Sequence, residues 1–79
     1  MPLVKKIGAY EFRFGSRGEQ NGPPHIHVWR GGAKAKFWLN PVVDLSTYQR
    51  FKRHELHEIE RLVCEHQQAF LEAWDEHFR

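Results

Sequence analysis

Apolar and polar residues alternate along three segments in the first half of the sequence, and this alternation limits the possible folds more than any other feature. The segments are Tyr10–Phe14, His25–Trp29 and Ala33–Leu39. Successive side chains of a β-strand point to opposite faces of its sheet, so the alternation is typical of strands with one buried face. Leu3–Ile7 and Val42–Leu45 are interpreted as further short strands, which gives a sheet of four or five strands within about residues 3–45.

Glycine and proline separate these segments. Arg30-Gly31-Gly32 is expected to form a tight hairpin turn, because glycine readily adopts the positive φ that such turns need. The segment Gly15–Pro24 is polar and contains glycines and prolines, so it is expected to be a loop.

The spacing of apolar residues changes at about Arg53. From there they recur at three, four and seven positions, as on one face of an amphipathic helix, at Leu56, Ile59, Val63, Phe70 and Trp74. Neither glycine nor proline interrupts this part of the chain, so one long helix is predicted over about residues 53–78. Ser46 with Gln49 resembles a capping box at a helix start, and Cys64, next to the apolar stripe, is expected to be a buried thiol.

These features predict a single α+β domain over residues 1–79, in which a small antiparallel sheet is covered on one face by a long C-terminal helix. A chain of 79 residues is too short for a second core. It has no apolar run long enough to span a membrane or to serve as a signal peptide, so a cytoplasmic location without membrane contact is expected. The single cysteine excludes an internal disulfide, and no cofactor is expected.

The predicted sheet has two different faces. Residues of one parity form an apolar face that should pack against the helix: Tyr10, Phe12, Phe14, Ile26, Val28, Ala35, Phe37 and Leu39. Residues of the other parity form a polar face: Glu11, Arg13, His25, His27, Trp29, Lys34, Lys36 and Trp38. A single helix covers only one side of a sheet, so the polar face is expected to remain uncovered.

Cations beside flat aromatic rings suit single-stranded nucleic acid, because lysine and arginine neutralise phosphates and bases stack on tryptophan. On this interpretation Arg13, Lys34 and Lys36 hold phosphate, and Trp29 and Trp38 stack on bases. Two other interpretations remain open. The face is an interface with a partner protein or a second copy, or it is a solvated face on which the two tryptophans form a stabilising cross-strand pair.

The distribution of charge agrees with an anion-binding first half. The formal net charge is +2. Residues 1–41 carry seven basic and two acidic residues, whereas residues 42–79 carry five basic and eight acidic residues. This asymmetry favours an anion-facing surface in the first half, although the two halves could also simply attract each other.

The segment His25-Ile26-His27 places two imidazoles on the same side of a strand. They could act as general acid and base, since imidazole titrates near neutrality. Cleavage of RNA at its 2′-hydroxyl needs such a pair and nearby cations but no metal, so an enzyme of this kind would be a metal-independent ribonuclease. The two histidines could instead ligate a metal with a third ligand from the helix or from the Gly15–Pro24 loop, or have a purely structural role.

The sequence resembles a known family in three places. They are Pro23-Pro24-His25-Ile26-His27-Val28, Ala35-Lys36-Phe37-Trp38-Leu39, and Glu55-Leu56 with Ile59-Glu60 and the closing Glu72-Ala73-Trp74. They are similar to a small bacterial and phage-borne family known as domain of unknown function four-one-six-zero. The resemblance implies one half of a toxin–antitoxin-like module, with a cognate antitoxin-like partner and an RNA target. Lys52 departs from the family pattern, which commonly has Asn or Ser there as a helix cap.

Taken together, the sequence predicts a toxin-like protein that binds RNA through its polar face and cleaves it with His25 and His27. The alternatives are a non-catalytic module for protein interaction or homodimer formation, and a small metal-binding protein that uses His25 and His27 as ligands.

Overall fold

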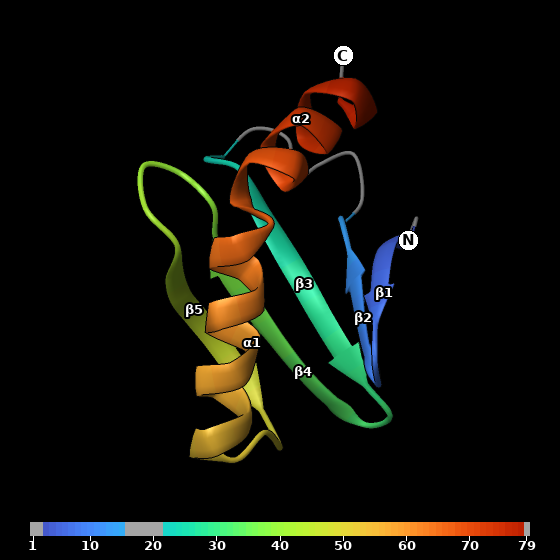
Figure 1. The fold of residues 1–79 in the computed structure, drawn as a ribbon, viewed down its shortest axis with the longest axis vertical. Helices are drawn as coiled ribbons and strands as arrows, with labels where there is room; N and C mark the ends of the chain where they lie inside the picture. Colours follow the sequence, from blue (N-terminus) through green and yellow to red (C-terminus); the bar gives the residue numbers. More distant parts are fainter. Residues whose placement is uncertain (1–2, 16–21, 79) are drawn as a thin grey trace.

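The alternating segments form the strands of one antiparallel sheet. A computed structural model describes residues 3–15 and 22–78. Its strands are β1 (Leu3–Ile7), β2 (Tyr10–Arg13), β3 (His25–Arg30), β4 (Ala33–Trp38) and β5 (Asp44–Gln49), followed by the helices α1 (Arg53–Glu65) and α2 (Gln67–His77). Each strand pairs with the next along the chain, in the order β1-β2-β3-β4-β5 (Figure 1). The predicted α+β fold is confirmed, with five strands in the sheet.

The hydrophobic core lies between the sheet and the helices. All the apolar strand residues that the sequence assigns to one face are buried there: Tyr10, Phe12, Phe14, Ile26, Val28, Ala35, Phe37 and Leu39. The helices contribute Ile59, Leu62, Val63, Phe70 and Trp74 to the same core. Figure 1 shows α1 across one face of the sheet, with α2 continuing toward the end of the sheet where β3 begins. The opposite side of the sheet is called the outer face below.

The hairpin between β3 and β4 has the expected turn. The two-residue connection is Gly31-Gly32, and Gly31 has φ of 57°. A side chain at this φ is costly, so glycine suits the position. Of the predicted Gly15–Pro24 loop, residues 16–21 lie outside the described part of the chain.

The prediction of one continuous helix is wrong, because the helical segment is interrupted at His66. This residue ends α1 with φ −107° and ψ 13°, and α2 begins at Gln67. The change of direction lets α2 reach aromatic residues of β2 and the residue that follows it. Phe70 lies against Phe12 with ring centroids 5.3 Å apart, and Trp74 meets Phe14 edge-on at 5.4 Å. Contacts with the sheet therefore prevail over the local preference for an uninterrupted helix.

The start of the helix also differs from the expected one. Ser46 and Gln49 do not cap a helix, since both belong to β5, which pairs with β4. The helix begins at Arg53, where the backbone N–H of Lys52 donates to Glu55 Oε1 at 2.8 Å. Lys52 itself makes no side-chain cap hydrogen bond. The side chain of Glu55 thus satisfies the backbone N–H of residue 52, whereas an Asn or Ser side chain at that position would accept from an N–H further along the first turn.

A partly buried ion pair lies at the edge of the core, at the start of α1. The guanidinium of Arg30 pairs with the carboxylate of Glu55, which is buried, and lies over the rings of Tyr10 and Phe51 at 5.8 and 5.7 Å. The hydrogen bond from the Lys52 N–H, and then the charge of Arg30, lower the pKa of Glu55. Burial, and then the charge of Glu58, raise the pKa of Tyr10. This cluster fixes the start of α1 against β2 and β3.

Cys64 is exposed, so the prediction of a buried thiol is wrong. Its neighbour Val63 is the residue that faces the core. The prediction relied on the position of Cys64 next to the apolar stripe in sequence, but consecutive helical residues point about 100° apart. Neither described helix is long and apolar enough to cross a membrane.

Candidate nucleic-acid interface

The outer face consists of side chains that the strand register arranges in three rows. The first row is Lys6, Glu11, Trp29, Lys34 and Gln49, each on its own strand and each opposite the next. The second is Arg13, His27, Lys36 and Thr47, and the third is His25, Trp38 and Asp44. The pairing therefore brings together on one side all eight residues that the sequence assigns to the polar face.

Each outer-face tryptophan lies next to a lysine. The ammonium of Lys34 is 5.5 Å from the centre of the Trp29 ring, and that of Lys36 is 4.5 Å from the Trp38 ring. Both distances fall within the range of cation–π attraction. Both rings are half-buried, so each keeps part of its surface open to a ligand. A positive charge beside a flat aromatic surface is thus repeated on the outer face.

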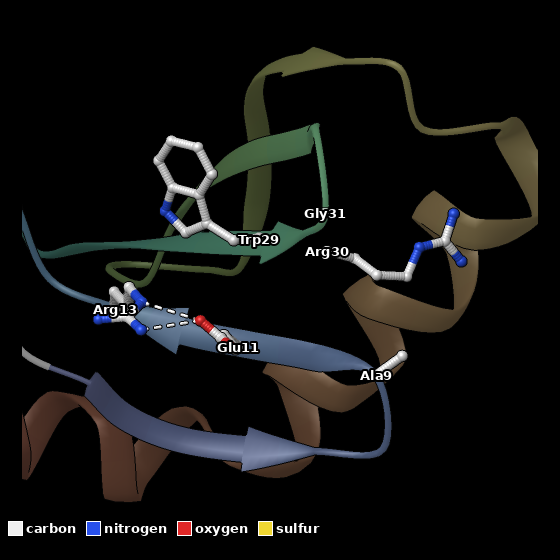
Figure 2. Close-up of a pocket in the computed structure, with 6 residues that line it drawn as sticks. All are labelled: Ala9, Glu11, Arg13, Trp29, Arg30 and Gly31. Atoms are coloured by element: carbon white, nitrogen blue, oxygen red, sulfur yellow. Dashed lines mark hydrogen bonds and ion pairs between the residues drawn. The ribbon is translucent and has the colours of Figure 1, made fainter.

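Trp29 separates two hollows. The first, of about 470 Å³, is lined by Ala9, Glu11, Arg13, Trp29, Arg30 and Gly31. Figure 2 shows the indole of Trp29 standing above its strand, with the paired Glu11 and Arg13 on the neighbouring strand, while the side chain of Arg30 points away toward α1. The second hollow, of about 330 Å³, includes His27, Trp29, Lys34, Thr47 and Gln49. A flat ring bounded by hollows is a suitable shape for stacking.

Within the first hollow, Arg13 is held by an acidic neighbour. Its Nε and Nη2 donate to Glu11 Oε1 at 3.1 and 2.8 Å. The two residues lie on the same side of β2, two positions apart. The Glu11 carboxylate therefore fixes the guanidinium and offsets part of its charge.

His25 lies on the outer side of β3 by register, but it is covered. Only 3% of its surface is exposed, because the ring lies 5.1 Å from that of Trp74 on α2 and 5.7 Å from that of Trp38. The expectation that the helix leaves this histidine uncovered is wrong, since α2 reaches the sheet at the start of β3. His25 Nδ1 is 3.1 Å from the Pro23 carbonyl oxygen, a distance that suits an N–H donated to that oxygen.

His27 is more accessible than His25. It is half-buried, lines the second hollow, and contacts His25 edge-on with ring centroids 5.2 Å apart. The two imidazoles are therefore adjacent, as the alternation predicts, but only His27 borders space that a ligand could enter. Their assignment as acid and base stays a prediction.

The metal-binding alternative needs a third ligand near the two histidines. Among residues 3–15 and 22–78, no group of three or more His, Cys, Asp or Glu side chains could hold a metal ion. The part of the predicted loop that could supply such a ligand, residues 16–21, lies outside the described residues.

The charges of the sheet and the helices are segregated. From Arg53 to His77, α1, α2 and the residue between them carry seven carboxylates and two arginines. The outer rows carry Lys6, Arg13, Lys34 and Lys36 against Glu11 and Asp44. The asymmetry seen along the sequence is thus an asymmetry between the basic outer face and the acidic helices.

Sequence reasoning missed the contribution of β5 to the outer face. Thr47 and Gln49 line the second hollow beside Lys34. They were overlooked because the fifth strand was expected to end at Leu45 and Ser46 to begin a helical turn. The alternation of polar Thr47 and Gln49 around Tyr48 was the available signal.

The structure thus defines a small α+β protein with one basic, aromatic sheet face. The sequence model of the family described as Domain of unknown function (DUF4160) matches residues 9–75. The chain belongs to this family, as its resemblance indicates. No curated protein and no solved structure matches it.

Proposed function

We propose that the outer face binds single-stranded RNA in the bacterial cytoplasm. The observation that carries this proposal is the pair of lysine–tryptophan contacts, Lys34 with Trp29 and Lys36 with Trp38, on the side of the sheet away from the core. Stacking on an aromatic ring contributes about 1–3 kcal/mol per base, and each lysine can neutralise a phosphate. Because every base has a flat face, this arrangement favours single strands over duplexes, whose bases are already stacked.

The acidic helices support a defined orientation of the RNA. A polyanion is repelled by the carboxylates of α1 and α2 and attracted by the outer face, so the segregated charges direct it to the sheet. A partner protein on the outer face would have no such requirement for negative charge. Salt dependence therefore distinguishes RNA binding from docking of a protein or a second copy through the tryptophans.

The test is a binding titration of a fluorescein-labelled polyuridine oligonucleotide at several salt concentrations. Lys34→Gln and Lys36→Gln should each weaken binding and reduce the slope of log affinity against log salt by about 0.7, the value for one lost phosphate contact on a single strand. Arg61→Gln is the matched control, because it removes one positive charge from the exposed side of α1. Equal effects of all three variants, or no binding by the unaltered protein, would contradict the proposal.

Metal-independent cleavage of the bound RNA is a second candidate activity. The contact between the imidazoles of His25 and His27 favours it. One imidazole would take the proton of the 2′-hydroxyl, whose oxygen attacks phosphorus, and the other would protonate the leaving 5′-oxygen. His27 borders the second hollow and would face the RNA directly, whereas His25 is covered and would have to become accessible to take the second role.

Cleavage is tested by incubating RNA with the protein in the presence of a metal chelator. Fragments ending in a 2′,3′-cyclic phosphate should form with the unaltered protein and disappear with His27→Ala. Binding without fragments would reject the catalytic part and leave the binding part standing.

The toxin-like role within a toxin–antitoxin module is proposed at the level of the cell, and the family resemblance supports it. Expression of the chain alone should slow bacterial growth, and co-expression of the gene beside it, the expected source of the antitoxin-like partner, should restore it. The double variant Lys34→Gln/Lys36→Gln should slow growth less if RNA is the target. Unimpaired growth on expression of the unaltered chain would reject this role.

A further inference from the structure

The two outer strands of the sheet differ in how they guard their free edges. β1 and β5 are the first and last strands in the sheet order. The centre of β1 carries Lys5 and Lys6, and lysine on an edge strand discourages pairing with another chain. From Leu45 to Gln49, β5 carries no charge and no proline, and its edge is interrupted only by the extra residue Ser46, where the register with β4 shifts. Its free edge is therefore suited to pairing with a further strand.

A hollow lined by apolar side chains and by Arg53, His57 and Glu60 lies beside this edge. It has a volume of about 280 Å³ between β5 and α1, and Leu45, Tyr48 and Leu56 are among its lining residues. Tyr48 is 54% exposed, whereas Leu45 and Leu56 are half-buried. The helix thus covers the inner side of β5 incompletely, and a strand added to β5 would place side chains over the uncovered part.

The charges at the two ends of β5 are complementary to each other. Asp44 begins the strand, and Arg50 follows its last residue; both are exposed. The guanidinium of Arg50 reaches the β3–β4 turn, where a Cβ at Gly32 would lie 3.0 Å from Nη1. In an antiparallel pair of two β5 strands, Asp44 of each copy lies at the end where Arg50 of the other copy is found. The charges at the ends of the strand therefore suit a second copy once the side chain of Arg50 turns from the β3–β4 turn toward the free edge.

We propose that two copies of this chain pair through β5, antiparallel, to form one continuous ten-stranded sheet. Tyr48 and Leu45 of each copy then cover those of the other beside α1. The pairing also joins the two outer faces edge to edge, through the row that ends in Gln49. It does not require RNA, because none of the interactions that hold it involves the outer-face tryptophans or lysines.

The first test is the mass of the full chain in solution, measured by sedimentation from micromolar to millimolar concentration. The unaltered protein should be a dimer, and Tyr48→Lys should shift it toward the monomer by placing a charge in the pairing edge. Val42→Lys is the matched control, since Val42 is 65% exposed but precedes the strand. It should leave the dimer intact.

The second test exchanges the charges at the ends of β5. Asp44→Arg alone and Arg50→Asp alone should each weaken dimer formation about tenfold, by replacing attraction with repulsion at both ends. Aspartate is suited to position 50, where φ is 65°. An equal mixture of the two variants should dimerise more tightly than either alone, because opposite charges then meet at both ends. A variant that failed to fold would show no such recovery.

Three outcomes would overturn the proposal. The first is a protein that stays monomeric throughout the concentration range. A monomer whose β5 edge binds only an extended segment of another protein counts as the same outcome. The second is a dimer that Tyr48→Lys and Val42→Lys affect equally. The third is a dimer that Trp29→Ala dissociates and Tyr48→Lys does not, which would place the interface on the outer face.

Discussion

At the scale of single residues, Glu11 and Glu65 occupy similar ion pairs in very different surroundings. Glu11 holds Arg13 at 2.8 Å on the outer face, and Glu65 holds Arg61 at 2.6 Å on α1. Only the first pair borders a hollow of the proposed interface. If RNA phosphate binds there, the Glu11 carboxylate repels it and offsets the charge of Arg13. Glu11 should therefore limit affinity.

Glu11→Gln is expected to raise RNA affinity about two- to fivefold at low salt, the effect of removing one partly exposed opposing charge. The gain should shrink as salt screens the charges. Titration of labelled RNA measures it, and Glu65→Gln provides the control that should change nothing. A loss of affinity in Glu11→Gln would mean that Glu11 contacts the RNA or positions Arg13 for it.

The lowered pKa of Glu55 gives a stability prediction with a definite sign. Its ionised form is favoured in the folded protein, first by the Lys52 N–H and then by Arg30. The resulting stabilisation is present above the pKa of an unfolded glutamate, roughly 4.3, and is lost as the pH falls through the lower folded value. Glu55→Gln should therefore reduce the free energy of unfolding at neutral pH. The difference in this free energy between the variant and the unaltered protein should become smaller in acid.

Denaturant unfolding at a series of pH values measures this difference. Glu60→Gln, at an exposed position of the same helix, is the control and should have little effect throughout. A difference between Glu55→Gln and the unaltered protein that stayed constant below pH 4 would show that the charge of Glu55 is not the source of the stabilisation.

At the scale of elements, α1 has one side in the core and one in solvent, and two nearby residues report its orientation. Ile59 is fully buried, whereas Cys64 is exposed. Ile59→Ala should lower the free energy of unfolding by about 2–5 kcal/mol because it leaves a cavity. Cys64→Ala should change it by less than about 0.5 kcal/mol. Chemical denaturation of both variants checks this, and similar losses for the two would mean that α1 is rotated from its described orientation.

The sequence was sufficient for elements whose periodicity is unambiguous. Two-residue alternation in β2, β3 and β4 separated the buried from the outer residues, because successive side chains of a strand point to opposite faces of the sheet. It was insufficient where local signals conflict with tertiary contacts. Ser46 and Gln49 carry a helix-start pattern, yet pairing with β4 places them in a strand. Similarly, nothing in the local sequence marks His66 as a break, because the break accompanies contacts of α2 with Phe12 on β2 and with Phe14 just after that strand.

The candidate site was likewise predictable where it depends on strand alternation, and not where it depends on tertiary contacts. Cross-strand register could be inferred from alternation and one hairpin turn, so the outer-face set was predictable. The burial of His25 was not, because it depends on where α2 reaches the sheet after the break at His66. For the same reason, the unequal exposure of the two histidines could come only from the structure.

At the scale of the whole molecule, the segregation of charge gives the two sides of the protein different roles. The basic outer face is expected to bind RNA, the acidic helices are expected to remain free of it, and the β5 edge is expected to pair with a second copy. Pairing at this edge would double the length of the RNA-binding surface without altering either face. Dimerisation should then increase affinity for long RNA more than for short RNA.

The most direct test of RNA binding by the outer face is nuclear magnetic resonance of the isotopically labelled protein during titration with a short single-stranded RNA. Amide resonances of β2, β3 and β4, together with the indole N–H signals of Trp29 and Trp38, should shift progressively, while those of the solvent-facing residues of α1 stay in place. Shifts confined to the helices, or no shifts at RNA concentrations that saturate ordinary single-strand binders, would contradict RNA binding by this face.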